Sequence, residues 1–163
     1  MVIGLPAIHA QLLEQRPPRT SAQMLDASAG GARLLCNADQ AAQLSVGQLV
    51  LLITGSDTPT LALVRWRHLN SEGLHLGLRY LKGLPRPVWL RRAPSAQTHP
   101  GVLQSTPAPG NGWHHGLWLP NGQFVEGENV WLQLASAHNQ AILPLPTANL
   151  ITASVTRYPM QLA

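Results

Sequence analysis

Two neighbouring segments, residues 60–68 and 74–80, alternate apolar and polar side chains along the chain. This period of two is typical of β-strands with one buried face. The Asn-Ser-Glu-Gly sequence between them favours a turn, so we expect a β-hairpin. The inward face of its first strand should carry Ala62, Val64 and Trp66. The outward face should carry a cationic patch of Arg65, Arg67, His75 and Arg79, which either extends an anion site, meets an acidic partner, or is a solvated sheet face.

Other short apolar runs, bounded by Gly, Asn, Ser and Asp, predict further strands in the first half. They cover residues 23–27, 32–36 and 48–54, and residues 87–92 are expected to close the same sheet. Residues 1–20 are interpreted as an N-terminal arm, either a short helix or a loose segment, that ends before Pro17. The main β unit of this half is therefore assigned to residues 21–92.

The second half has the same short-strand pattern after a break. Residues 93–112 are rich in Pro, Ser, Thr, Gly and Gln and lack periodicity, which predicts a flexible linker. Residues 113–163 then predict a second small β unit. Its strands are expected at residues 113–119, 129–135, 140–145 and 150–158.

Charge is sparse and unevenly placed in this chain of 163 residues. Charged residues make up 11% of the total, which argues against disorder, and the formal net charge is +4. Residues 16–92 hold ten Lys and Arg against Asp26, Asp39, Asp57 and Glu72, a balance of +6. Residues 113–163 have a balance of −1. An anionic partner is therefore expected at the first half, unless the arginines only solubilise a β surface.

Several functional classes find no support in the sequence. Cys36 is the only cysteine, which excludes an internal disulfide and a zinc site of cysteines. The adjacent residues His114 and His115 should point to opposite faces of a strand, so no metal site is predicted. No hydrolase, Walker or dinucleotide motif is present, and we expect no enzymatic activity and no cofactor. No run is long enough for a membrane span and no signal peptide is visible, so the expected location is the cytoplasm.

The most specific chemistry lies in the turn Asp26-Ala27-Ser28-Ala29-Gly30-Gly31. A carboxylate and a hydroxyl two residues apart share a face of an extended chain, and the two glycines permit a tight reversal or a close ligand. Just upstream, Arg16 and Arg19 offer guanidinium groups that suit phosphates and guanine edges. The plainer alternative is a β-turn in which Asp26 and Ser28 bond the local backbone.

These residues resemble the PilZ domain, a bacterial receptor module for cyclic di-GMP. Its Arg-x-x-x-Arg element and Asp/Asn-x-Ser-x-x-Gly motif match Arg16 and Arg19, with one intervening residue fewer, and Asp26, Ser28 and Gly31. The likeness continues in order over residues 16–92, through Val-Gly-Gln-Leu-Val, Val-Arg-Trp and Leu-Gly-Leu-Arg-Tyr. The expected fold class is therefore all-β, a small PilZ-like antiparallel β-barrel followed by a second small β unit.

The resemblance also implies a function and a set of site residues. The expected ligand is cyclic di-GMP, and its binding residues would be Arg16, Arg19, Asp26, Ser28, Gly30 and Gly31. The chain would then be a bacterial signalling module that relays nucleotide occupancy to an unidentified protein partner. The alternative is a degenerate PilZ-like domain that binds no nucleotide and serves as a protein-interaction or oligomerisation platform. A nucleic-acid polymer and a membrane are not expected as partners.

The resemblance leaves two structural questions open. Only six residues separate Arg19 from Asp26, where the family has a whole first strand. The barrel either lacks that strand, takes it from residues 2–13, or takes it from another chain. The second β unit is similar to an extension that follows PilZ-like segments in longer proteobacterial proteins, so the chain is expected to be the C-terminal piece of a larger protein.

Overall fold

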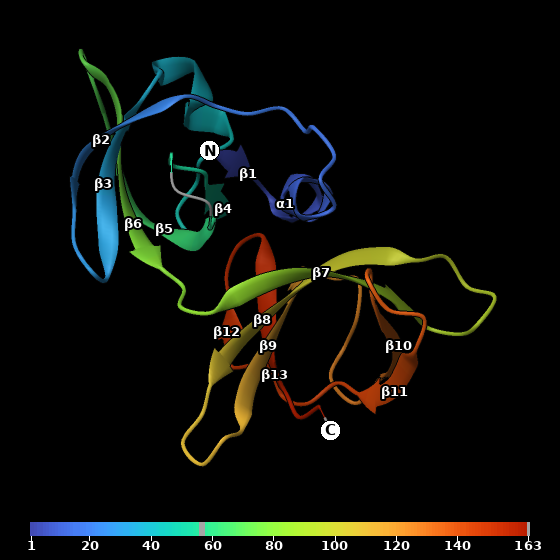
Figure 1. Ribbon diagram of the computed structural model, residues 1–163. Coiled ribbons are helices and arrows are strands. Elements are labelled where there is room, and N and C mark those ends of the chain that lie inside the picture. Colours follow the sequence, from blue (N-terminus) through green and yellow to red (C-terminus); the bar gives the residue numbers. More distant parts are fainter. Residues whose placement is uncertain (56–57, 163) are drawn as a thin grey trace.

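The computed structural model describes residues 1–55 and 58–162, so Asp57, counted above among the acids, lies outside the described residues. The chain forms two curled antiparallel sheets, which confirms the predicted all-β class (Figure 1). The elements of the first half are β1 (Val2–Ile3), α1 (Leu5–Leu12), β2 (Ala22–Ala27), β3 (Gly31–Cys36), the 3-10 helix Ala38–Ala42, β4 (Leu49–Leu52), β5 (Thr60–Asn70) and β6 (Gly73–Tyr80). Those of the second half are β7 (Leu84–Arg91), β8 (His99–Pro107), β9 (Trp113–Pro120), β10 (Asn129–Leu134), β11 (Gln140–Pro144), β12 (Leu150–Ile151) and β13 (Val155–Met160).

The first sheet has the strand order β1-β4-β5-β6-β3-β2, with β1 and β2 as its edge strands. Met1 and Thr20 exchange two hydrogen bonds of 2.9 Å between the start of β1 and the residues that precede β2. Val2–Ile3 forms β1, which pairs antiparallel with β4. Of residues 1–20, only Val2–Ile3 belong to the sheet, while Leu5–Leu12 form α1, the short helix that was one of the two predicted alternatives for this segment.

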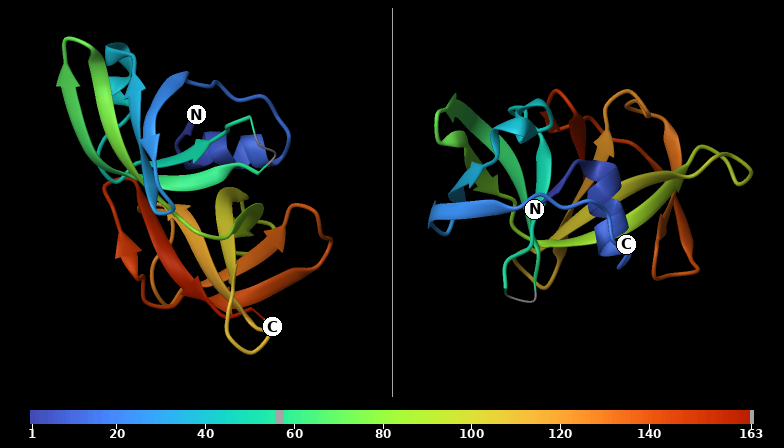
Figure 2. Two further views of the ribbon diagram at one scale, coloured as in Figure 1. Left: turned by 60° about the vertical axis from the view of Figure 1, so that its left-hand side comes forward. Right: turned by 90° about the horizontal axis from the view of Figure 1, so that it is seen from above.

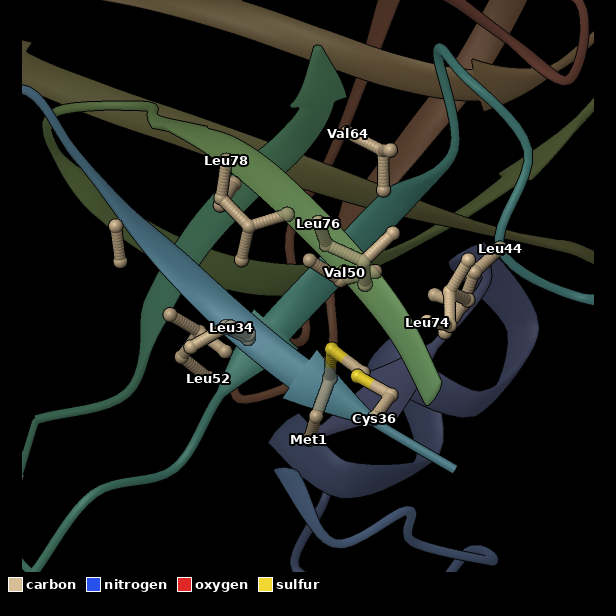
Figure 3. Close-up of a cluster of buried hydrophobic side chains, with 12 residues drawn as sticks. Met1, Leu34, Cys36, Leu44, Val50, Leu52, Val64, Leu74, Leu76 and Leu78 are labelled. Atoms are coloured by element: carbon tan, nitrogen blue, oxygen red, sulfur yellow. The ribbon is translucent and has the colours of Figure 1, made fainter. Parts of the chain in front are cut away.

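The interior of this sheet is filled by small aliphatic side chains. Alternate residues of each strand point inward, because side chains of a strand alternate between its two faces. Figure 3 shows the cluster, which includes Leu34, Val50, Val64, Leu76 and Leu78, each 5% exposed or less. Cys36 is buried in the same cluster, and burial raises the pKa of its thiol.

The second sheet has the order β11-β10-β7-β8-β9-β13-β12, and it corrects two sequence predictions. Residues 87–92 do not close the first sheet, because β7 pairs with β8 and β10. The predicted linker at 93–112 is wrong in its central part, because β8 lies inside the second sheet between β7 and β9. The strand escaped notice because its buried positions include polar Gln104 and Ser105, which hydrogen-bond to Trp118 and His115.

A third apolar cluster joins the two sheets. The run Leu49–Leu52 is buried on both faces: Val50 and Leu52 fill the first sheet, while Leu49 and Leu51 pack outward with Trp118 of the second sheet. Helix α1 lies between the sheets (Figure 2) and adds Leu5 and Ile8 to this junction. The two β units are therefore held together by a shared apolar core. Among the described residues, no helix has the length and apolar character needed to cross a bilayer.

Candidate functional site

The predicted turn forms the tip of the β2–β3 hairpin and is held by local hydrogen bonds. The Ser28 amide donates to the Gly31 carbonyl at 2.8 Å, and the Gly30 amide donates to the Ser28 hydroxyl at 3.3 Å. Asp26 lies opposite Arg33 in the strand register, and their side chains form an ion pair of 3.1 Å. The hydroxyl thus follows the plain β-turn alternative, whereas the carboxylate engages a guanidinium group rather than the backbone.

The two glycines of the turn have different roles. A Cβ added at Gly31 would overlap the Leu78 carbonyl oxygen of β6, so only glycine permits this close pairing of β3 with β6. A Cβ added at Gly30 would meet nothing within 4 Å. Gly31 is therefore required by the sheet itself, and Gly30 keeps open space beside the turn.

A β-bulge in β5 creates the platform next to this turn. The register between β5 and β6 shifts between Val64 and Trp66, so Arg65 has no partner of its own and Trp66 pairs with Gly77. Trp66 therefore lies on the outer face rather than inward as predicted. A Cβ at Gly77 would overlap its indole ring, so the ring rests on the glycine while the side chain stays 45% exposed. An aromatic ring backed by the sheet and open on its other side can stack on a planar ligand.

The turn and the platform line one open groove on the outer face of the first sheet, called here the turn groove. Its polar and charged lining residues are Asp26, Ser28, Arg33, Arg65 and Arg79, and its floor contains Gly30, Gly31 and Gly77. The guanidinium groups of Arg65 and Arg79 make no hydrogen bond or ion pair with any described residue, whereas that of Arg33 is paired with Asp26. Three guanidinium groups against one carboxylate give the groove a positive balance suited to an anion.

The structure does not bring the predicted arginine pair to this groove. Arg16 and Arg19 are exposed on the segment that precedes β2, whereas Asp26 lies near the far end of that strand (Figure 1). Arg19 instead donates a hydrogen bond of 3.0 Å to Gln11 of α1. Arg19 and Asp26 are only a few residues apart in the sequence, but they lie at opposite ends of β2. Because a strand is extended, its two ends are far apart in space.

The predicted cationic patch on the hairpin is also divided by the bulge. Arg65 and Arg79 line the turn groove, but Arg67 donates to the carbonyl oxygens of Ala41 and Leu44 at 2.7 and 3.3 Å. His75 pairs with Glu72 at 3.1 Å. Arg67 and His75 therefore serve local structure, since the one-residue shift turns Arg67 toward the inner side.

Sequence reasoning missed two residues of the groove, Arg33 and Trp66. Arg33 was detectable, because a short hairpin that reverses at residues 28–31 places it across from Asp26. The position of Trp66 could not be predicted, because nothing in the apolar pattern indicates the bulge that turns this side chain outward.

The adjacent histidines of β9 are predicted to point to opposite faces, but both line one pocket together with Arg157, Pro159 and Met160. His114 is exposed, while His115 is half-buried and its Nδ1 lies 2.8 Å from the Ser105 hydroxyl. Burial, the Arg86 guanidinium and His114 lower the pKa of His115. No group of three or more His, Cys, Asp or Glu side chains close enough to hold a metal occurs within residues 1–55 and 58–162.

Comparison with known proteins returned no match, either to a protein-family model, to a curated protein or to a solved structure. The assignment of a function therefore depends on the chemistry of the groove.

Proposed function

We propose that this chain is a non-enzymatic receptor that binds cyclic di-GMP in the turn groove and relays its occupancy to a protein partner. One observation carries the proposal: the Trp66 ring rests on Gly77, open on one side, among Arg33, Arg65 and Arg79. Stacking of a base on an aromatic side chain contributes about 1–3 kcal/mol. Guanidinium groups add charge-assisted hydrogen bonds to phosphate.

The roles of the groove residues follow from their chemistry. Trp66 stacks on a guanine, and the unpaired Arg65 and Arg79 bind the phosphodiester oxygens. The Asp26 carboxylate has acceptor capacity beyond its bond to Arg33 and accepts from the guanine N–H edge. Arg16 and Arg19 have no part in this version of the site, which differs from the expectation given by the resemblance.

Isothermal titration calorimetry with cyclic di-GMP tests the proposal. We expect the wild-type chain to bind, and Trp66→Leu and Arg65→Gln each to lower the affinity about tenfold, the equivalent of one charge-assisted hydrogen bond or one stacked base. Arg16→Gln is the matched control, because it removes the same charge from an exposed site outside the groove. No binding by the folded wild-type chain, or equal losses in Arg65→Gln and Arg16→Gln, contradicts the proposal.

The alternative function, a protein-interaction or oligomerisation platform, is favoured by a different observation. Strand β2 is the edge of the first sheet, and its side chains are exposed over most of its length, Met24 included. An exposed edge strand can pair with a strand of another chain. Analytical ultracentrifugation would detect self-association, and Met24→Lys should abolish it while leaving cyclic di-GMP binding unchanged.

A further inference from the structure

A second groove, called here the junction groove, runs along the boundary between the two sheets. It lies where the chain leaves β6 for β7 and passes the face formed by β8, β9 and β13. Arg79 of β6 and Lys82 of the connection between the sheets line one side, and Gln104, Asn149 and Arg157 line the side of the second sheet. Arg79 also lines the turn groove, so the two grooves adjoin at this residue.

The charge of the junction groove is of one sign. Its described lining contains Arg79, Lys82 and Arg157 but no Asp or Glu. The charged side-chain groups of these three residues make no hydrogen bond or ion pair with another described residue. Three cations that converge without a counter-charge repel one another, and an anion placed among them removes that repulsion.

Arg157 is held in place by the second sheet. A Cβ at Gly116 of β9 would overlap its guanidinium group, which therefore lies against the glycine backbone. The guanidinium carbon is also 5.9 Å from the centre of the Trp118 ring. Burial lowers the pKa of Arg157, although a guanidinium stays charged in a protein. A fixed, partly desolvated cation has lost part of its hydration and gains from a bound anion.

The other arginines of the second half of the chain, unlike Arg157, have polar partners within the protein. Arg86 donates to the Ser105 hydroxyl at 3.1 Å, Arg91 donates to the Pro94 carbonyl at 2.6 Å, and Arg92 pairs with Glu128. Arg157 alone among them has no polar partner within the described residues. Its guanidinium N–H groups are thus available to a ligand.

We infer that the junction groove is a second anion-binding site, which takes a phosphate group between Arg79, Lys82 and Arg157. Asn149 lines the same groove, and its amide can donate to the remaining phosphate oxygens. Because Arg79 lies on β6, Lys82 in the connection and Arg157 on β13, a bound phosphate ties the two sheets together. The phosphate belongs either to the ligand of the turn groove, in which case the inference rests on the proposed function, or to a separate anion.

Calorimetry with pyrophosphate as the probe tests the site directly. We expect the wild-type chain to bind it, and Arg157→Gln and Lys82→Gln each to weaken binding about tenfold, since each removes a charge-assisted contact. Arg91→Gln is the matched control, because it removes the same charge at the far end of β7. Lys82 is exposed, so its variant folds even if Arg157→Gln does not. Equal affinities in Lys82→Gln and Arg91→Gln overturn the inference.

The source of the phosphate is decided by adding cyclic di-GMP. If its own phosphate occupies the junction groove, pyrophosphate competes with it and Arg157→Gln weakens both ligands. If the anions are separate, both bind at once and Arg157→Gln weakens pyrophosphate alone. The two proposals can be contradicted separately. If pyrophosphate binding requires Arg157 but cyclic di-GMP does not bind, only the proposed function is contradicted. If cyclic di-GMP binding requires Arg65 but pyrophosphate binding is unchanged by substitution of Arg157 and Lys82, only the second site is contradicted.

Discussion

The two sheets use their arginines differently. On the outer face of the first sheet, Arg65 and Arg79 surround Trp66 and bind no other described group. On the second sheet, Arg86 and Arg92 are bound to the protein's own side chains, and Arg157 is the exception. A guanidinium already bonded by its own protein stabilises the fold, whereas a positioned but unbonded one is available to a ligand. Among these described arginines, the unbonded guanidinium groups are therefore found on the first sheet and at the junction.

The largest effect is expected from breaking the core that the two sheets share. Leu61 of β5 is fully buried in the junction cluster, and Leu61→Ala should lower the free energy of unfolding by about 2–5 kcal/mol. Both sheets should lose stability together in urea denaturation followed by tryptophan fluorescence and circular dichroism. The control, Leu84→Ala, truncates a leucine that is 55% exposed and should change little. Two separate transitions in the wild-type chain would show that the sheets are independent.

The two glycines of the turn should respond differently to the same added methyl group. Gly31→Ala forces a Cβ against the Leu78 carbonyl and should cost about 1–3 kcal/mol of stability, the usual range for overpacking. Gly30→Ala enters open space and should leave stability nearly unchanged. Thermal denaturation of both variants measures the difference. Equal melting temperatures would mean that β3 and β6 are not as closely paired as described.

Part of this fold is predictable because local pattern and tertiary structure agree. The alternating segments of β5 and β6 predicted the hairpin, and the continuous apolar run of Leu49–Leu52 predicted a strand. That run is apolar throughout because both of its faces are buried, one in each core. β8 was missed for the opposite reason: its buried Gln104 and Ser105 satisfy their polar groups through partners far along the chain, which a single sequence does not reveal.

The candidate site was predictable only where residues lie next to one another on a hairpin. Asp26, Ser28, Gly30 and Gly31 are found together because the turn sequence determines their arrangement. Arg79 joins them through the strand register, opposite Gly31. The bulge at Arg65 exchanges the facing of Trp66 and Arg67, and no period-two pattern predicts a one-residue shift.

The side-chain directions that the bulge gives to Arg65 and Arg67 can be tested by measuring the stability of variants. Arg67 donates to two backbone carbonyl oxygens, so Arg67→Met should lower the free energy of unfolding by about 1.5 kcal/mol, the low end for a hydrogen bond from a charged group. Arg65→Met removes an exposed side chain without a described partner and should stay within about 0.5 kcal/mol. Urea denaturation compares the two. The reverse order would place Arg65 on the inner side and remove it from the groove.

The smallest effect concerns the contact of α1 with the second sheet. His9 is buried, its Nε2 lies 3.0 Å from the Val88 carbonyl oxygen, and burial lowers its pKa. In the unfolded chain an imidazole titrates near pH 6.5, so below that pH the unfolded state binds a proton that the folded state resists. The contribution of His9 to stability should therefore be constant above about pH 6.5 and fall as the pH is lowered from there. In urea denaturation at pH 7.5 and 5.5, His9→Gln should show a smaller loss than the wild-type chain, because its amide keeps the donor to Val88 but does not titrate. The wild-type chain and the variant both retain His115 and the Met1 amino group, whose pKa values are also lowered. An equal loss in the two proteins would therefore assign the pH dependence to groups other than His9 and not to the α1 contact.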